Sequence, residues 1–259
     1  MKIGFLSDVH FEFHKQTPNW LPPLPQECDV LVLAGDISVG DHTLEAVKRI
    51  SAQVPTTHIV WIAGNHDFYD SNIEHQIEIY RVQCAELPFI HFLENESVII
   101  DGVTFLGATL WTDFSVLGPQ SQQEGSILAQ RCIADFHHIH ISDNELWHPQ
   151  SAARKFADSQ HWLQTKLSSI KDQPCVVVTH FPPCRDAKHG GFEESLLSTY
   201  FQANCEDLIK TYQPNLWIYG HNHYSRSFKI GKTHICSNQL GYPDENVPGI
   251  QFPVVELQL

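Results

Sequence analysis

The sequence contains few basic residues for its length. Lysine and arginine together number 16 in 259 residues, against 30 aspartate and glutamate residues, and the formal net charge is -14. Because the phosphate backbones of nucleic acids are held by lysine and arginine, this balance argues against a broad nucleic-acid surface. A nucleic acid is therefore not an expected partner.

The sequence also lacks a long apolar run and any paired-cysteine motif. No stretch approaches the ~18 apolar residues of a membrane span. Ser7 and Asp8 interrupt the first apolar run before it reaches the length of a signal-peptide core. The seven cysteines include no CxxC pair, and a disulfide framework is not expected at this size. We predict a soluble cytoplasmic protein with no membrane partner, and nothing in the sequence predicts an oligomeric state.

The first third of the chain alternates between apolar runs and helical patterns. The runs at 2–7, 29–34 and 58–63 are typical of buried strands, and apolar residues recur at helical spacing in 41–52 and 71–86. Alternation of strand and helix implies parallel strands joined by right-handed crossovers.

Later segments predict a second, more antiparallel sheet. Asp101-Gly102, between two apolar stretches, is a strong hairpin signal, and a further turn is expected at Gly231-Lys232. Further strands are expected at 174–179, 217–219, 225–230, 233–237 and 254–257, the last four in the second sheet, and helices at 129–136, 152–170 and 204–212. No repeat or interdomain linker is present, so we predict one domain over residues 1–259 with a lid insertion at about 112–150.

Five of the predicted strands end in polar side chains that can bind a metal ion. The central example is the stretch VWIAGNHD, in which an apolar run ends abruptly in Gly64-Asn65-His66-Asp67. In open α/β sheets, ligands gather outside the carboxyl ends of the strands. We therefore expect the following side chains to meet at one sheet edge: Asp8, His10, Asp36, Asn65, His180, His221 and His223.

This group of side chains offers both oxygen and nitrogen ligands. Carboxylate, amide and imidazole together suit Mn, Fe or Zn, whereas a calcium or magnesium site would be nearly all oxygen and a structural zinc site would use thiolate. Seven ligands are too many for one small ion but suit two ions that share a bridging carboxylate. Two such ions can hold a bridging water and clamp both oxygens of an in-line displacement at phosphorus. The expected cofactor is a pair of divalent or trivalent ions, which would also offset part of the negative charge.

The order and approximate spacing of these motifs resemble the calcineurin-like metallophosphoesterase superfamily. The motifs are Asp8-x-His10, Gly35-Asp36, Gly64-Asn65-His66-Asp67, the lone His180 after an apolar strand, and Gly220-His221-x-His223. The stretch SNQLGYPDE (237–245) is also similar to the tail of small bacterial-type predicted phosphohydrolases of that superfamily. The resemblance implies a four-layer α/β/β/α sandwich with two mixed β-sheets and an active site along one sheet edge.

The resemblance further implies a role for each residue. One metal would be bound by Asp8, His10, Asp36 and His223, and the second by Asp36, Asn65, His180 and His221, with Asp36 bridging. His66 would be the catalytic acid that protonates the leaving alkoxide, or would stabilise charge on the phosphoryl oxygens.

The sequence departs from the pattern of this superfamily at two positions. Its protein phosphatases carry GDxxD, whose second aspartate orients the catalytic histidine, but here Val39 occupies that position and Asp41 follows two residues later. Relatives often have a second histidine directly after the lone strand-end histidine, where this chain has Phe181. The missing aspartate counts against a protein phosphatase.

Two other polar features have more ordinary explanations. Asp67 is expected to cap a turn rather than to take part in catalysis. The run His137-His138-Ile139-His140 could be a third metal site, but adjacent histidines point in different directions on any regular element, which favours a solvated or lid surface. We place Asp113, Asp135, His137 and His138 on a lid that would narrow the site.

The expected activity is hydrolysis of small phosphate esters by attack of a metal-bridging hydroxide, with phosphodiesters slightly favoured. The alternatives are a phosphomonoesterase or a protein phosphatase. A nuclease is disfavoured by the negative charge. A non-catalytic scaffold is disfavoured because all the ligands and His66 are present.

Overall fold

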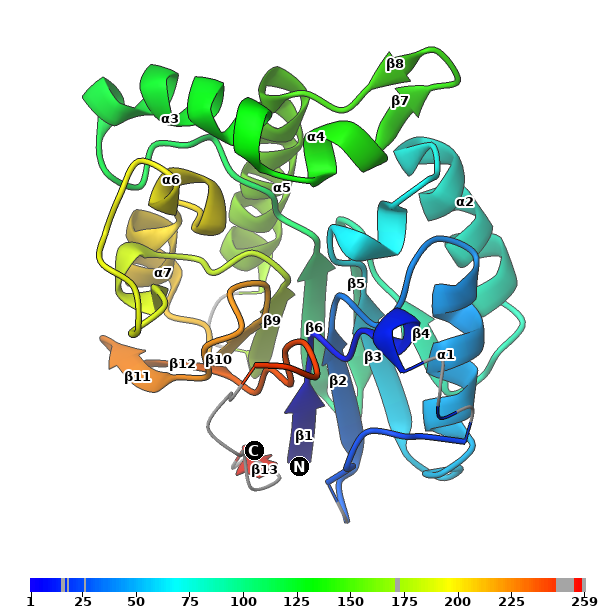
Figure 1. Ribbon diagram of the computed structural model, residues 1–259. Coiled ribbons are helices and arrows are strands. Elements are labelled where there is room, and N and C mark those ends of the chain that lie inside the picture. Colours follow the sequence, from blue (N-terminus) through cyan, green and yellow to red (C-terminus); the bar gives the residue numbers. More distant parts are fainter. Residues whose placement is uncertain (15–16, 18, 26, 171–172, 246–253, 258–259) are drawn as a thin grey trace.

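Two large β-sheets lie face to face at the centre of the molecule (Figure 1). The computed structural model describes residues 1–14, 17, 19–25, 27–170, 173–245 and 254–257. The first sheet has the strand order β13-β1-β2-β3-β4, and the second has the order β11-β12-β10-β9-β6-β5. The strands of the first sheet are β1 (Lys2–Leu6), β2 (Val30–Ala34), β3 (His58–Ile62), β4 (Ile90–Phe92) and β13 (Val254–Glu256). Those of the second are β5 (Glu96–Ile100), β6 (Val103–Ala108), β9 (Cys175–Thr179), β10 (Leu216–Tyr219), β11 (Ser227–Ile230) and β12 (Thr233–Ser237).

Both sheets are mixed, with parallel strands inside and antiparallel strands at edges. β1 to β4 run parallel, as do β6, β9, β10 and β12, whereas β13, β5 and β11 pair antiparallel with their neighbours. The expected hairpins are confirmed, because Ile100 pairs with Val103 across Asp101-Gly102 and Ile230 pairs with Thr233 across Gly231-Lys232.

Alternation of side chains along the strands builds four layers. One set, which includes Val32, Val60 and Val178, fills the space between the two sheets. The alternate set, such as Trp61 and Trp217, packs under helices on the outer faces. In Figure 1, α1 and α2 cover the first sheet, and α5 and α7 cover the second. The helices are α1 (His42–Ser51), α2 (Ile73–Cys84), α3 (Pro119–Cys132), α4 (Asp135–His138), α5 (Pro149–Ser169), α6 (Ser198–Phe201) and α7 (Glu206–Tyr212). The α/β/β/α sandwich with two mixed sheets is thereby confirmed.

Two of the predicted elements were wrong in detail. The strand near residue 254 pairs with β1 in the first sheet and not with the second sheet, because its partner is set by contacts with the other end of the chain that a local pattern cannot show. The helix expected at 129–136 is α3, which begins at Pro119; Ile133 leaves the helical conformation before the short α4 starts at Asp135. Proline at the first turn and Gly118 before it mark the start of α3.

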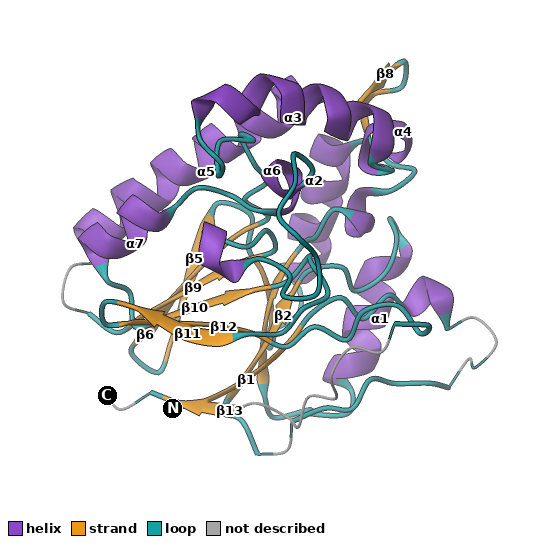
Figure 2. Cartoon of the chain, turned by 60° about the vertical axis from the view of Figure 1, so that its left-hand side comes forward, coloured by secondary structure: helices purple, strands orange, loops and turns teal. Residues whose placement is uncertain are grey.

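The segment 112–150 lies across the carboxyl ends of the strands, as Figures 1 and 2 show from two sides. It contains α3, α4 and the small hairpin of β7 (His140–Ser142) and β8 (Glu145–Leu146). α3 packs against α5 and α6, and a bridge between Asn72 and His140 joins the segment to the start of α2. Within the described residues, no helix is long and apolar enough to span a membrane.

Candidate metal centre and active site

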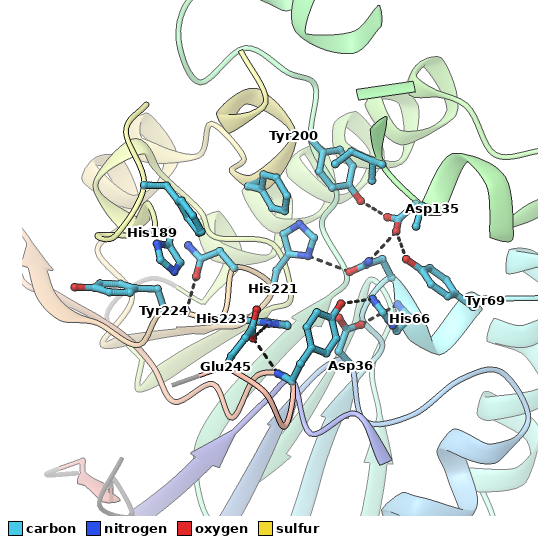
Figure 3. Close-up of a pocket in the computed structure, with 17 residues that line it drawn as sticks. Asp36, His66, Tyr69, Asp135, His189, Tyr200, His221, His223, Tyr224 and Glu245 are labelled. Atoms are coloured by element: carbon cyan, nitrogen blue, oxygen red, sulfur yellow. Dashed lines mark hydrogen bonds and ion pairs between the residues drawn. The ribbon is translucent and has the colours of Figure 1, made fainter. Parts of the chain in front are cut away.

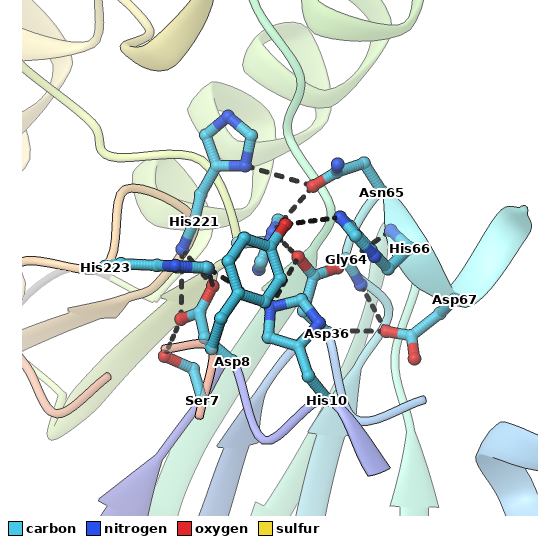
Figure 4. Close-up of polar contacts among 12 residues, drawn as sticks. Ser7, Asp8, His10, Asp36, Gly64, Asn65, His66, Asp67, His221 and His223 are labelled. Atoms are coloured by element: carbon cyan, nitrogen blue, oxygen red, sulfur yellow. Dashed lines mark hydrogen bonds and ion pairs between the residues drawn. The ribbon is translucent and has the colours of Figure 1, made fainter. Parts of the chain in front are cut away.

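The polar residues that follow five strands meet at one edge of the two sheets (Figure 4). β1 leads to Asp8 and His10, β2 to Asp36, β3 to Asn65 and His66, β9 to His180, and β10 to His221 and His223. Asp8, His10, Asp36, His221 and His223 all have a positive φ, between 49° and 80°. Such left-handed backbone costs a non-glycine residue roughly 1–3 kcal/mol and is concentrated at functional sites. The fold therefore holds these side chains in place at the expense of local backbone strain.

The expected ligands form two clusters. The nearest ligand atoms of Asp8, His10 and His223 lie within 4.8 Å of one another, and so do those of Asp36, His180 and His221. In the first cluster, Nε2 of His10 is 3.1 Å from Nε2 of His223.

Asn65 and Asp36 complete the second cluster. Oδ1 of Asn65 is 2.9 Å from Nε2 of His180 and 3.0 Å from Nδ1 of His221. Oδ2 of Asp36 is 3.2 Å from Nε2 of His180 and 3.9 Å from Nε2 of His10. Asp36 thus lies between the two clusters, which is the position a bridging carboxylate requires.

The electrostatics of the clusters fit positively charged ions. Asp8 and Asp36 are almost completely buried. Burial favours the neutral form of Asp36, but His180 and His66 outweigh it and hold the pKa of Asp36 well below its usual range. Burial opposes protonation of His180 and His223, yet Asp36 raises the pKa of His180 to about 9 and Asp8 raises the pKa of His223 to about 10. The carboxylates therefore attract positive charge, which metal ions would supply in place of these protons.

His221 shows the opposite behaviour. Burial, and then the neighbouring His180, hold the pKa of His221 well below its usual range. A neutral imidazole keeps a free lone pair, and Nδ1 of His221 faces the second cluster. On its other side, the ring of His221 stacks on Phe181 at a centroid distance of 4.0 Å. Phe181 thus orients a candidate ligand through its ring.

Gly64 has no Cβ atom, and this allows the neighbouring ligands Asp36 and His180 to lie close to the backbone. A Cβ atom at Gly64 would lie 2.2 Å from Oδ1 of Asp36 and 2.7 Å from Cε1 of His180. Any larger residue would push these two ligands out of place. The glycine of the GNHD motif is therefore a requirement of close packing at the site.

His66 lies beside the clusters and is held on three sides. Its Nδ1 is 3.3 Å from Oε1 of Glu12, its Nε2 is 3.2 Å from the hydroxyl of Tyr242, and its ring stacks on Tyr69 at 4.3 Å. Burial alone would lower the pKa of His66, but the charge of Asp36 and the hydrogen bond to Glu12 raise it. A protonated His66 is thereby favoured.

Glu12 and Tyr242 were missed by the sequence reasoning. Oε1 of Glu12 also lies 2.9 Å from Nδ1 of His10, so one carboxylate binds the rings of two histidines. The alternation Asp8-x-His10-x-Glu12 was the available signal, since it places three polar residues at equal spacing after β1. Asp41, the other acidic candidate near Val39, is exposed at the start of α1.

Asp67 acts on the backbone, as the turn-capping interpretation expects. It is completely buried, and its carboxylate accepts hydrogen bonds from the backbone N–H groups of Asp36, Ile37, Ser38 and Gly64, at 2.7–3.2 Å, and from the hydroxyl of Thr43 at 3.0 Å. Through these five hydrogen bonds, the carboxylate of Asp67 connects the loop after β2, the loop after β3 and the start of α1. Asp67 thereby fixes the loops that carry Asp36 and Asn65.

Asp135 supports the site from the segment 112–150. Its buried carboxylate accepts hydrogen bonds from Nδ2 of Asn65 at 2.9 Å, from the hydroxyl of Tyr69 at 2.7 Å and from the hydroxyl of Tyr200. Because Nδ2 of Asn65 is bound in this way, Oδ1 faces the histidines. Of the four residues placed on the lid, Asp113, Asp135, His137 and His138, only Asp135 lines the main cavity, and His137 and His138 are exposed.

The segment 237–245 reaches the site through Glu245 and Tyr242. Oε2 of Glu245 is paired with Nδ1 of His223 and accepts a hydrogen bond from the backbone N–H of Tyr242 at 2.9 Å. The Nε2 atom of His223 is thereby directed toward the first cluster. Orientation of a ligating imidazole by a carboxylate on its other nitrogen is common in metal sites.

Comparison with known proteins gives a family and several similar folds. The model of the calcineurin-like phosphoesterase family matches residues 1–225. The chain is 27% identical to the uncharacterized protein L509 of Acanthamoeba polyphaga mimivirus, covering 94% of this chain and 92% of that protein. It is 23% identical to a UPF0046 protein of Caenorhabditis elegans, covering 86% of this chain and 63% of that one.

Among solved structures, the chain resembles the crystal structure of a phosphopantetheinyl hydrolase from Mycobacterium tuberculosis. The TM-score is 0.74 at 20% sequence identity, and the match covers 93% of this chain and 90% of the hydrolase. At that identity, the likeness concerns the fold alone.

The role of Asp67 can be tested by measuring stability. Asp67→Asn replaces an acceptor oxygen with an NH₂ group that faces backbone N–H donors, so we expect the free energy of unfolding to fall by about 2–4 kcal/mol. Urea denaturation measures the change. Asp70→Asn is the matched control, because the side chain of Asp70 is 84% exposed and its loss should change stability by less than about 0.5 kcal/mol. Equal stability of the two variants would show that Asp67 does not hold the loops together.

Proposed function

The chain belongs to the calcineurin-like phosphoesterase family, and on that premise we propose that it hydrolyses small phosphate esters at a centre of two metal ions, with phosphodiesters favoured. Membership of the family makes the protein a metal-dependent phosphoester hydrolase. The number of ions, the roles of individual residues and the substrate class are our proposal.

The observation that carries the proposal is the pair of ligand clusters on either side of Asp36. One ion would be held by Asp8, His10, Asp36 and His223, and the other by Asp36, Asn65, His180 and His221. When bound, the ions would lower the pKa of a water molecule and offset negative charge on the phosphoryl oxygens. Mn, Fe or Zn suits this mixture of oxygen and nitrogen donors.

His66 is the proposed catalytic acid. In hydrolysis, a water oxygen forms a bond to phosphorus while the bond from phosphorus to the leaving oxygen breaks. The leaving oxygen then needs a proton, and Nε2 of His66 is the ring nitrogen that Glu12 does not bind. The hydrogen bond between Glu12 and the other ring nitrogen favours the protonated form that can donate.

Glu12 is the proposed positioning residue for His66. In the protein phosphatases of the superfamily that this chain resembles, the second aspartate of GDxxD orients the catalytic histidine, but Val39 occupies that place here. Glu12 approaches Nδ1 of His66 from the end of β1. A carboxylate on Nδ1 keeps a proton on that atom and leaves Nε2 to face the substrate, so Glu12 can supply the missing orientation from another part of the chain.

The preference for a diester rests on charge. A phosphate monoester carries about -1.5 to -2 charges at pH 7, whereas a diester has a single ionisable oxygen and carries a single negative charge. Neither lysine nor arginine lines the main cavity among the residues the structure describes, so the additional charge of a monoester meets no permanently cationic side chain there. We propose that the segment 112–150 is a lid that excludes protein surfaces and duplex nucleic acid.

A substrate panel tests the proposed activity. The protein reconstituted with Mn²⁺ should show a higher kcat/KM on bis-p-nitrophenyl phosphate than on p-nitrophenyl phosphate, a phosphoserine peptide or duplex DNA. EDTA should abolish hydrolysis because the charge compensation and water activation depend on the ions. Faster turnover of the peptide or the duplex than of both small esters would contradict the proposal.

The shared role of Asp36 can be measured by metal content. Asp36→Asn removes the charge of the bridging carboxylate, so elemental analysis should find both ions depleted, whereas His10→Ala should mainly deplete one. Asp41→Asn is the control, since Asp41 is an exposed aspartate of the same loop and should leave two ions bound. Two bound ions and unchanged activity in Asp36→Asn would exclude the bridging role.

The acid role of His66 predicts a dependence on the leaving group. His66→Ala should retain its metal and lose on the order of 10²–10⁴ in kcat on an alkyl ester, with a smaller loss on a nitrophenyl ester, whose leaving group needs little protonation.

The positioning role of Glu12 predicts the same pattern with a smaller loss in Glu12→Gln. This variant is assayed at saturating metal because Glu12 also contacts His10. Glu12→Asp should restore part of it. Equal losses on both esters would argue against the acid role and against its positioning by Glu12.

A further inference from the structure

A cavity of about 590 Å³ opens beside the candidate metal centre (Figure 3). This volume is typical of sites for complete small molecules and exceeds the needs of a phosphate group alone. Asp36, Asn65, His66, His221 and His223 form part of its lining. Most of the remaining lining residues belong to 133–135, 189–201 and 224–245.

An aromatic wall forms one side of this cavity. We use that name for His189, Phe192, Phe201 and Tyr224, all of which line it. The ring of His189 lies 4.3 Å from Phe192 and 4.7 Å from Tyr224, and Phe201 lies 5.4 Å from the ring of His221. The wall therefore extends directly to a candidate metal ligand.

Phe192 is the most unusual member of the wall. Its side chain is 73% exposed, more than any other large hydrophobic residue that the structure describes. Phe192 and Phe201 also border a second cavity, of about 330 Å³. Exposing an apolar ring to water is unfavourable. A ligand that covers the Phe192 ring removes this surface from water, which adds to its free energy of binding.

The charge of the cavity restricts what can lie against the wall. The described lining residues include Asp36, Asp135 and Glu245 but neither lysine nor arginine. Burial lowers the pKa of His189, so its ring is mainly neutral at pH 7. Once metal ions offset Asp36, the remaining acidic groups still oppose a second anion. The scissile phosphate therefore finds its positive charge at the metal centre, and an anionic group elsewhere on the substrate would meet neither lysine nor arginine in the described lining of this cavity. In the second cavity, the one lysine of the described lining, Lys188, lies among two carboxylates, Glu193 and Glu194.

The position of His66 decides which part of the substrate meets the wall. Figure 3 places His66 and Tyr69 on one side of the cavity and His189 and Tyr224 on the other, with His221 and His223 between them. Because His66 would protonate the leaving oxygen, the departing alcohol lies on the His66 side. In an in-line displacement the attacking and leaving oxygens lie opposite one another at phosphorus, and the retained ester group projects to the side. The aromatic wall, away from His66, is the part of the cavity that can receive this group.

From this arrangement we infer that the aromatic wall binds an uncharged, flat or apolar group esterified to the phosphate that is retained in the product. The inference rests on the proposed function and adds the substrate class: a phosphodiester with one uncharged aromatic or apolar ester group and no second phosphate. A monoester would leave the wall uncovered, which gives a second reason for the preference for diesters.

Three diesters with the same leaving group provide the test. They are the methyl, phenyl and 4-carboxyphenyl esters of p-nitrophenyl phosphate, hydrolysed by the metal-loaded enzyme. The phenyl ester should have a kcat/KM at least 10-fold above that of the methyl ester, because its ring covers the wall. The 4-carboxyphenyl ester matches the ring but adds a negative charge, and it should be at least 10-fold poorer than the phenyl ester.

Variants then locate the preference at the wall. Phe192→Ala should lower kcat/KM for the phenyl ester by about 3- to 10-fold, the size of one aromatic contact, and change the methyl ester less than 2-fold. Phe192→Trp should retain the preference because it keeps an aromatic face. Phe89→Ala is the control, since Phe89 is a 41% exposed phenylalanine beside His58 and outside the cavity, and it should change neither ester.

The outcomes separate this inference from the proposed function. Equal kcat/KM for the methyl and phenyl esters in the unaltered protein, or an equal loss on both esters in Phe192→Ala, would overturn the aromatic wall while leaving the phosphodiesterase intact. A 4-carboxyphenyl ester that is the best of the three would overturn the exclusion of anions. Absence of hydrolysis of all three diesters, with p-nitrophenyl phosphate cleaved, would reject the diester preference and this inference together.

Discussion

The buried carboxylate of Asp67 is the interaction on which the geometry of the site depends. It binds four backbone N–H groups and one hydroxyl, and these donors come from the loops after β2 and β3 and from the start of α1. The parallel sheet alone brings the two strand ends to the same edge, but it does not fix the loops beyond them. Asp67 does so with groups that would otherwise be unpaired donors in the interior. Asp36 and Asn65 can then face the same point although 28 residues separate them in the sequence.

The site contains buried charges and strained backbone, and contacts with the surrounding fold must stabilise both. Two buried carboxylates lie among imidazoles, and five of the residues adopt left-handed backbone. A second set of carboxylates surrounds this group: Glu12 binds His10 and His66, Asp135 binds Asn65, and Glu245 binds His223. Each one fixes which atom of its partner faces the centre. The charges of Asp36 and Asp8 raise the pKa values of His180 and His223, respectively, despite the burial of both rings.

The candidate ligands at the strand ends could be predicted because the local sequence shows both the buried strand and the polar residues that follow it. An apolar run that stops at a Gly-Asp or Gly-Asn-His unit indicates a buried strand and a polar edge at once. The supporting carboxylates could not be predicted in this way. Asp135 approaches from the 112–150 segment, and Glu245 from the end of the chain, so their roles depend on contacts across 70 and 22 residues. The pairing of β13 with β1 was missed for the same reason, since a strand pattern gives no information about its partner.

Glu12 shows how one physical requirement can be met from different places in a sequence. A histidine that protonates a leaving group needs a fixed orientation, and a carboxylate on its second nitrogen provides it. A motif search places that carboxylate at position 39, finds valine there and concludes that the dyad is lost. In the folded chain, η1 (Phe11–Phe13) brings Glu12 to 3.3 Å from Nδ1 of His66. Because the same carboxylate also lies 2.9 Å from Nδ1 of His10, the orientation of His66 is coupled to that of a candidate metal ligand. Valine at position 39 therefore does not exclude the proposed acid role of His66, whereas a change at Glu12 would affect both His66 and the candidate ligand His10.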